Sequence, residues 1–354
     1  MTTYIPFLKA KTGELTAMSE LSPEVKQAIC PLFDFPRNNE NYSEENYEKK
    51  TRKIARSLAK HWGAGVEFYF DDFDISQRIQ IEGEHQYSFV LRTLSELEVI
   101  PVVGFDRTTH NSSVTGLKRE GIITSNVVAF RIEREDFEDY RSKEEDIEYD
   151  LADVFNEFEE VDLLFDCRLC TNMDAVVTAQ QIATFARLFS QAYPMVRRII
   201  VTGSSIPASL RDAVNTDETA TLPRLELEII AQVRNLTGLD IITGDYATVS
   251  PMYSDMNISP QLFQKITAPK LIYSFDTFHY ISRGTSLESG GQDQYVGLTN
   301  TLCNKRFFRG PGYSSGERYF DEKRRRIGNG ATNGTVVKPS VVAHITYMVL
   351  SANV

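Results

Sequence analysis

The sequence predicts an α/β protein built on a closed (βα)8 TIM-like barrel with an irregular C-terminal extension. Short runs of β-branched and aromatic residues alternate with longer stretches of helical period along the first 245 residues, a pattern typical of βα units and a parallel sheet. Eight such runs are present. No glycine-rich turn follows the first run, where an open dinucleotide-binding sheet would carry one, so the pattern favours the closed barrel over the open doubly wound sheet.

The predicted strands and helices follow one another in regular order. The eight strands are expected at 4–8, 31–35, 66–70, 99–105, 127–132, 161–165, 198–202 and 239–243. The clearest helices between them are expected at 47–62, 174–193 and 222–235, where apolar residues recur at helical spacing. The first connection, from Lys9 to Cys30, is long enough for one helix, and Pro23 is expected near its start because proline is favoured in the first turn.

The chain changes character after residue 245, which predicts two regions. Residues 1–265 are assigned to the barrel, and residues 266–354 to an extension packed on it. Within the extension, 269–284 predicts an added strand or hairpin, and 284–340 predicts loops rich in glycine and arginine. The apolar segment 341–350 fits either a closing strand or a helix.

Composition and charge exclude several classes of protein. With 42% hydrophobic and 25% charged residues, the chain resembles ordinary globular proteins and not disordered, collagenous or coiled-coil ones. A net charge of -11 disfavours general binding of nucleic acid, which is a polyanion. No run approaches the ~20 apolar residues that cross a bilayer, and the N-terminus lacks the pattern of a signal peptide. We therefore expect no membrane association, a cytoplasmic location and reduced thiols on the four cysteines.

Charged side chains follow most of the predicted strands. Asp34, Asp71, Asp106, Asp166 and Asp245 come at the ends of five different strands. In a parallel barrel these ends gather at one mouth, where substrates and catalytic groups normally lie. Converging carboxylates repel one another, so such a mouth needs a divalent cation, a bound cationic molecule or Lys and Arg partners.

Two interpretations of the mouth remain open. In the first, Asp71, Asp166 and Asp245 bind Mg²⁺ or a similar cation, Lys9 and Arg131 hold an anion, and His344 serves as a general base. In the second, the carboxylates form salt bridges with Lys9, Arg131 and Arg168, and the mouth is only a binding surface. Any one strand-end carboxylate is also suited to cap the helix that follows it.

Several short motifs resemble those of a known family. They are YIPFLKAKTGELTAMSELS at the start, PLFDFPR, FYFDD, AFRIE, LLFDCR, TGSSIP, TGDYA, YSFDTFHYISRG, GNG and AHIT. In this order they resemble the phage beta-protein family, which occurs in bacteriophages and in bacterial mobile or defence loci. The resemblance spans nearly the whole chain. One departure is visible: members tend to carry Trp before the Arg-Gly pair, where this chain has Phe278, His279 and Tyr280.

The resemblance implies matching positions but no reaction or cofactor. The positions that match family motifs are Lys9, Glu14, Asp34, Asp71, Arg131, Asp166, Asp245, Tyr246, Tyr273, Arg283 and His344. They agree with the barrel mouth inferred from strand ends, and they add Tyr273, Arg283 and His344 from the extension.

We therefore predict a phage- or defence-associated barrel protein that binds an anionic small molecule, such as a nucleotide, at the strand C-terminal face. The predicted ligand-binding residues are Lys9, Asp34, Arg131, Arg168, Tyr246, Tyr273 and Arg283, and the predicted catalytic residues are Asp166, Asp245 and His344. An enzyme with this site would be a metal-assisted hydrolase. The alternative is a non-catalytic component that binds a protein partner in a defence or toxin-antitoxin assembly, since the acidic segment 133–160 and the basic segment 305–326 are complementary in charge. The sequence leaves open which of the two it is.

Overall fold

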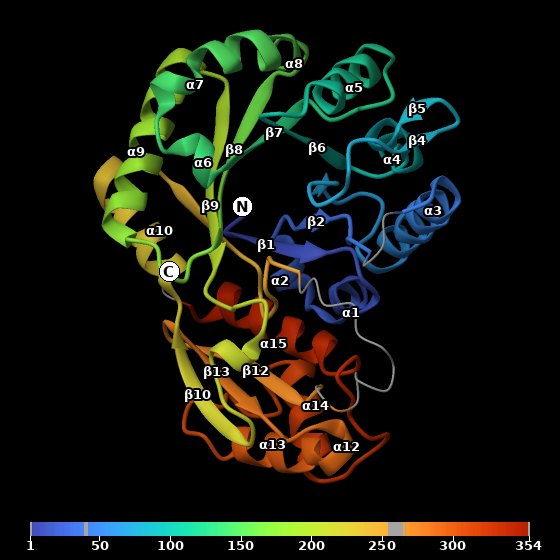
Figure 1. Cartoon of the computed structure of the whole chain (residues 1–354), viewed down its shortest axis with the longest axis vertical. Coiled ribbons are helices and arrows are strands. Elements are labelled where there is room, and N and C mark those ends of the chain that lie inside the picture. The colour runs from blue at the N-terminus through green and yellow to red at the C-terminus, as the bar shows by residue number, and fades with distance from the viewer. Residues whose placement is uncertain (1, 39–41, 254–264, 266, 353–354) are drawn as a thin grey trace.

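A closed eight-stranded barrel forms the larger part of the protein (Figure 1). The computed structural model describes residues 2–38, 42–253, 265 and 267–352. The barrel strands are β1 (Tyr4–Lys9), β2 (Leu32–Asp34), β3 (Phe68–Asp71), β6 (Val99–Gly104), β7 (Val127–Glu133), β8 (Glu160–Leu169), β9 (Val196–Ser204) and β11 (Ile241–Asp245). They are all parallel and lie in chain order, with β11 pairing to β1. The predicted (βα)8 barrel is confirmed, and each strand overlaps its predicted run.

Helices connect the strands and cover the outside of the barrel. They are α1 (Thr12–Ala17), η1 (Met18–Glu20), α2 (Pro23–Gln27), α3 (Glu44–His61), α4 (Gln86–Thr93), α5 (Thr108–Arg119), α6 (Arg134–Phe137), α7 (Tyr140–Asp146), η2 (Ile147–Leu151), α8 (Ala152–Glu157), α9 (Ala175–Ala192) and α10 (Leu225–Thr237). The prediction of one helix in the first connection is wrong. Pro23 does begin a helix, but Ser22 caps it as a separate element by accepting a hydrogen bond from the Val25 amide.

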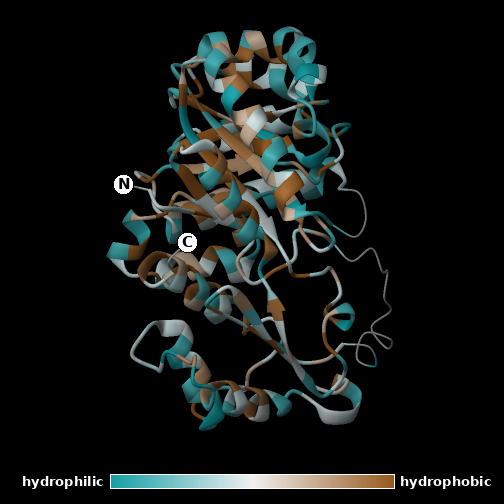
Figure 2. Ribbon diagram, turned by 90° about the vertical axis from the view of Figure 1, so that its left-hand side faces the viewer, coloured by the Kyte–Doolittle hydropathy of each residue, from teal (hydrophilic) through white to brown (hydrophobic). Residues whose placement is uncertain are grey.

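Alternate residues along each barrel strand belong to two different hydrophobic layers, one inside the barrel and one between the strands and the helices. Ile5 and Phe7 of β1 point into the barrel with Leu164 and Ile200 of other strands. Tyr4 and Leu8 belong instead to the larger cluster between the strands and the helices. Figure 2 shows the apolar residues along the barrel strands, whereas hydrophilic residues gather on the outer helices.

A smaller lobe carries an antiparallel sheet of three strands. Its strands are β10 (Glu218–Pro223), β13 (Phe278–Arg283) and β12 (Lys270–Phe275), in that order across the sheet. β12 and β13 form the hairpin that was one of the two predicted options. β10 was not predicted; it comes from the connection between β9 and α10, so a segment within the barrel part of the chain and the C-terminal part together build this sheet. A short ladder, β4 (Gln80–Ile81) with β5 (Glu84–His85), lies in the connection between β3 and α4.

The stretch 284–340 contains helices as well as loops. They are α12 (Leu287–Gly290), α13 (Gln294–Cys303) and α14 (Ser315–Arg324), and they pack in the smaller lobe (Figure 1). Ser286 and Ser314 begin α12 and α14 by accepting hydrogen bonds from the Ser289 and Gly316 amides. These caps explain how helices arise in a segment so rich in glycine.

The last helix, α15 (Val337–Leu350), joins the lobe to the barrel. It contacts β1, α1 and α2 on one side and β12 and α14 on the other (Figure 1). It therefore packs on the barrel as the helix that follows the eighth strand, and the smaller lobe, apart from β10, is inserted between β11 and α15. Of the two options for 341–350, the helix is the one that forms. Within the described residues, no helix combines the length and apolarity needed to cross a membrane.

Candidate functional site

Arg131 lies at the centre of the barrel mouth and draws three carboxylates together. Its Nη1 donates to Asp34 Oδ1 at 2.7 Å and to Asp71 Oδ2 at 2.9 Å. Its Nη2 donates to Asp166 Oδ2 at 2.6 Å. These side chains come from four different strands and are almost completely buried, with Arg131 1% exposed. The structure thus brings together four of the residues predicted at the mouth, and it pairs their charges directly.

Aromatic side chains close this cluster off from solvent. The Tyr246 hydroxyl donates to Asp166 Oδ2 at 2.6 Å and accepts from Arg131 Nη2 at 3.0 Å. The Phe73 ring lies 4.3 Å from the Arg131 guanidinium carbon and also contacts Arg107 and Arg168. Arg168 in turn pairs with Asp74 at 3.0 Å, not with Asp166 through its side chain. The centre of the mouth is therefore a packed polar core and not an open cavity.

Burial changes the proton affinity of two carboxyl groups here. It raises the pKa of Asp34 to about 6, although Arg131 acts in the opposite direction. It raises the pKa of Glu133 to about 7, and the nearby Asp166 adds to that effect. Glu133 ends β7 and is only half-buried, so its protonation can follow the pH of the solvent.

Asp245 and His344 lie together, but in a different place. Asp245 is on the outer side of β11, where its Oδ2 is 2.9 Å from His344 Nε2 and 2.5 Å from Arg224 Nη2. The Tyr4 hydroxyl donates to Asp245 Oδ1, and Ser274 Oγ is 2.6 Å from His344 Nδ1. All of these side chains are buried. This second cluster connects the barrel to α15 and to the inserted sheet.

The predicted metal ligands do not converge. Asp71 and Asp166 contact Arg131, whereas Asp245 contacts Arg224 and His344. Among the residues that the structure describes, only Asp71, Asp72 and His110 meet as a group of His, Cys, Asp or Glu side chains that could hold one ion.

Two predicted ligand-binding residues lie in the inserted lobe. Tyr273 is buried, and its hydroxyl donates to Glu317 Oε1 at 3.0 Å. Arg283 ends β13, opposite Lys270 in the sheet, and its Nη1 donates to the Val214 carbonyl at 3.1 Å. Neither contacts the Arg131 cluster.

A cavity of about 330 Å³ lies beside the mouth, between the barrel and the lobe. The ends of β1, β9 and β11 form one wall, and β12 and α15 form the other. Its polar lining includes Lys9, Lys11, Glu14 and Lys270, and its apolar lining includes Ile206, Leu210, Val249, Met252, Ile272, Val336 and Val337. Sequence reasoning selected Lys9 but missed Lys11 and Lys270. The available signal for Lys11 was its position just after the first strand, at the same rim as Lys9, whereas Lys270 begins β12 and no local signal placed it there.

Comparison with protein families matches residues 4–350 to the family described as Beta protein. The chain belongs to the beta-protein family. This confirms the resemblance drawn from the sequence motifs. No match is found among curated proteins.

In this family member Lys9 is the most enclosed of the lysines that line the cavity. Its side chain is almost fully buried, its Nζ donates to the Ser250 carbonyl at 3.0 Å, and it lies 3.6 Å from the centre of the Tyr253 ring. Burial, helped by Lys11 nearby, lowers the pKa of Lys9 to about 8. Within the described part of the chain, no carboxylate oxygen lies within 4.0 Å of Lys9, Lys11 or Lys270, so their charges are not neutralised by close ion pairs.

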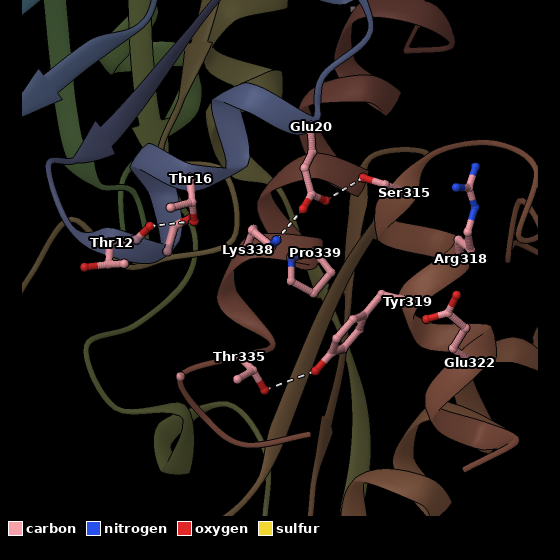
Figure 3. Close-up of a pocket in the computed structure, with 12 residues that line it drawn as sticks. Thr12, Thr16, Glu20, Ser315, Arg318, Tyr319, Glu322, Thr335, Lys338 and Pro339 are labelled. Carbon is pink, nitrogen blue, oxygen red and sulfur yellow. Dashed lines mark hydrogen bonds and ion pairs between the residues drawn. The ribbon is translucent and has the colours of Figure 1, made fainter. Parts of the chain in front are cut away.

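A larger cavity, of about 590 Å³, lies between α1 and the helices α14 and α15 (Figure 3). Its charges are mixed. Glu20 pairs with Lys338 and accepts a hydrogen bond from Ser315 at 2.8 Å, while Arg318 and Glu322 lie on the facing helix. Because its carboxylates offset its cations, this cavity has no preference for an anion.

Half of the basic residues in segment 305–326 form ion pairs within the lobe. Arg309 binds Glu317 at 3.1 Å, and Arg324 binds Asp321 at 2.7 Å. Arg325 also binds Asp321. These ion pairs reduce the positive charge that the segment presents outward.

Proposed function

We propose that the chain binds a small molecule carrying a phosphate group, such as a nucleotide, in the cavity between the barrel mouth and the inserted lobe. One observation carries the proposal: Lys9, Lys11 and Lys270 line this one cavity without a carboxylate in ion-pair contact among the described residues. In a protein with a net charge of -11, three ammonium groups against the single carboxylate of Glu14 in one recess form a local attraction for anions. The volume of about 330 Å³ is at the lower end of small-molecule sites.

The rest of the lining suits the remainder of such a ligand. Ile206, Met252 and Ile272 supply apolar surface, as is usual in small-molecule sites, where a few polar groups fix the orientation. The loops after the seventh and eighth barrel strands also line the cavity. In this fold these loops frequently bind phosphate. The resemblance to a family that occurs in bacteriophages and in bacterial mobile or defence loci supports a role for this binding in one of those settings.

The proposal concerns binding and includes no hydrolytic step. Asp166 is buried against Arg131 and Tyr246, and Asp245 is buried against Arg224. Neither lines the cavity. The carboxylates predicted for metal-assisted hydrolysis therefore form ion pairs elsewhere and do not face the proposed ligand.

Titration calorimetry with inorganic phosphate, pyrophosphate and ATP tests the proposal. The wild-type chain is compared with the double variant Lys11→Gln, Lys270→Gln, which changes two lining residues. The matched control is Lys53→Gln, Lys60→Gln on the exposed side of α3, which alters the net charge equally. We expect saturable binding of at least one of the three anions, a loss of roughly tenfold or more in affinity in the cavity variant, and unchanged affinity in the control. Equal affinity in both variants, or no saturable binding by the wild type, would overturn the proposal.

A further inference from the structure

Two buried hydrogen-bond acceptors face each other behind the barrel mouth. His110 lies on α5, and its Nε2 is 2.7 Å from the Val102 carbonyl oxygen. A carbonyl oxygen can only accept, so Nε2 carries the hydrogen and Nδ1 of the neutral ring has a free lone pair. That Nδ1 lies 3.1 Å from Oδ1 of Asp72, which follows β3. Both side chains are completely buried.

Neither atom has a hydrogen-bond donor among the described residues. Asp72 Oδ1 and His110 Nδ1 are both without a partner, while the other Asp72 oxygen accepts from Gln86 Nε2 at 2.8 Å. Asp71 adds a carboxylate oxygen within 4.8 Å of both atoms. Buried acceptors that converge in this way are unfavourable unless a positive charge lies between them.

His110 and Asp72 are held in place by neighbours that leave their free atoms unoccupied. The His110 ring stacks on Tyr87, with ring centres 3.8 Å apart. Its Nε2 hydrogen bond to a carbonyl is the arrangement that usually orients a metal-bound histidine, leaving the other nitrogen for the ion. Both oxygens of Asp71 accept hydrogen bonds from arginines, Oδ1 from Arg107 and Oδ2 from Arg131, so Asp71 offers an ion only the second lone pair of one oxygen.

We propose that Asp71, Asp72 and His110 bind a divalent transition-metal ion of the Zn²⁺ or Mn²⁺ class at a buried site in which these three side chains supply the protein ligands. Two ligand atoms that are each about 2.1 Å from one ion lie roughly 3.0 Å apart at the right angle of octahedral coordination and roughly 3.4 Å apart at the tetrahedral angle, and the 3.1 Å separation of Nδ1 and Oδ1 falls between these values. An imidazole nitrogen favours these ions over Mg²⁺, which prefers oxygen ligands and water. The ion would tie the end of β3 to α5. The site shares Asp71 with the predicted Mg²⁺ site but replaces Asp166 and Asp245.

The decisive variant is Asp72→Asn, which preserves shape. The new amide can keep its oxygen toward Gln86 and donate a hydrogen from its nitrogen to His110 Nδ1. We therefore expect this variant, in the presence of a chelator, to be at least as stable as the wild type while it loses the metal. His110→Gln is a second ligand variant, and His61→Gln on α3 is the control for removal of a histidine.

Full-length protein is stripped with a chelator, incubated with ZnCl₂, MnCl₂ or MgCl₂, and desalted, after which bound metal and Tm are measured. We expect about one Zn²⁺ or Mn²⁺ per chain and a raised Tm in the wild type and in His61→Gln. Both ligand variants should retain neither effect, and Mg²⁺ should not be retained by any protein. Equal metal content in Asp72→Asn and the wild type would overturn the proposal. So would a metal-free wild type whose ¹⁵N spectrum shows both His110 nitrogens protonated, because a proton would then occupy the place assigned to the ion.

Discussion

Arg131 and Asp166 form a buried ion pair at the centre of the barrel mouth, with Nη2 of the arginine 2.6 Å from Oδ2 of the aspartate. The same guanidinium also serves Asp34 and Asp71, so one cation compensates three carboxylates. Because burial removes the alternative of solvation by water, the cluster depends on Arg131 for its charge balance.

Replacing Arg131 with methionine should destabilise the protein strongly. The substitution leaves three buried carboxylates without their shared partner, and removing one member of a buried ion pair typically costs about 3–5 kcal/mol. The free energy of unfolding in urea measures this cost. Arg134→Met is the matched control, because Arg134 is exposed and only 3.6 Å from Glu138, a geometry worth less than about 1 kcal/mol. Similar values for the two variants would contradict the role assigned to Arg131.

Anion binding in the lysine-lined cavity should weaken at alkaline pH. The anion binds the protonated form of Lys9, whose pKa is lowered to about 8 by burial. Once the phosphate groups are ionised, above about pH 6, affinity should therefore fall as pH rises through the pKa of Lys9, because a proton must then be taken up on binding. Calorimetry with pyrophosphate across this range gives the profile. In Lys9→Met the alkaline decline should disappear together with part of the affinity; an unchanged decline would assign it to another group.

Glu133→Gln should stabilise the protein at neutral and alkaline pH. Burial raises the pKa of Glu133 to about 7 from an ordinary value of 4.5, so between these values the folded state holds a proton that the unfolded chain has lost. The wild-type free energy of unfolding therefore falls as pH rises from 4.5 to 7 and stays lowered above that. The advantage of the variant should be full above pH 7 and vanish near pH 4.5. Thermal melts at several pH values measure it, with Glu135→Gln at an exposed neighbouring position as the control. An advantage that grows toward acid pH would reverse the proposed sign.

Asp245→Asn should loosen the joint between the barrel and the inserted lobe. The neutral amide leaves Arg224 buried with Glu226 as its remaining acidic partner and weakens the contact to His344. We expect a loss of roughly 3 kcal/mol in the free energy of unfolding and faster amide exchange in α15. Asp240→Asn, an exposed position just before β11, should leave both measurements unchanged. Normal exchange in α15 of the Asp245 variant would show that this cluster does not hold the joint.

The sequence by itself determined the barrel fold and the placement of charged side chains at the C-terminal ends of its strands. Eight β-branched and aromatic runs separated by helical stretches leave few ways to bury every strand, and parallel strands bring their C-terminal ends to one rim. For this reason Asp34, Asp71, Arg131 and Asp166 could be placed together before their contacts were known, although they span more than a hundred positions.

Tertiary structure decided which side of the wall each residue occupies and what lies beside the mouth. Asp245 and Tyr246 are neighbours in sequence, yet Tyr246 points inward to Asp166 while Asp245 points outward to His344, because successive strand residues face opposite sides. Lys9 and Lys270 share a cavity only because the chain inserts a lobe before its last helix returns to the barrel. Such long-range pairings depend on the packing of whole elements, and the local pattern of residues does not contain them.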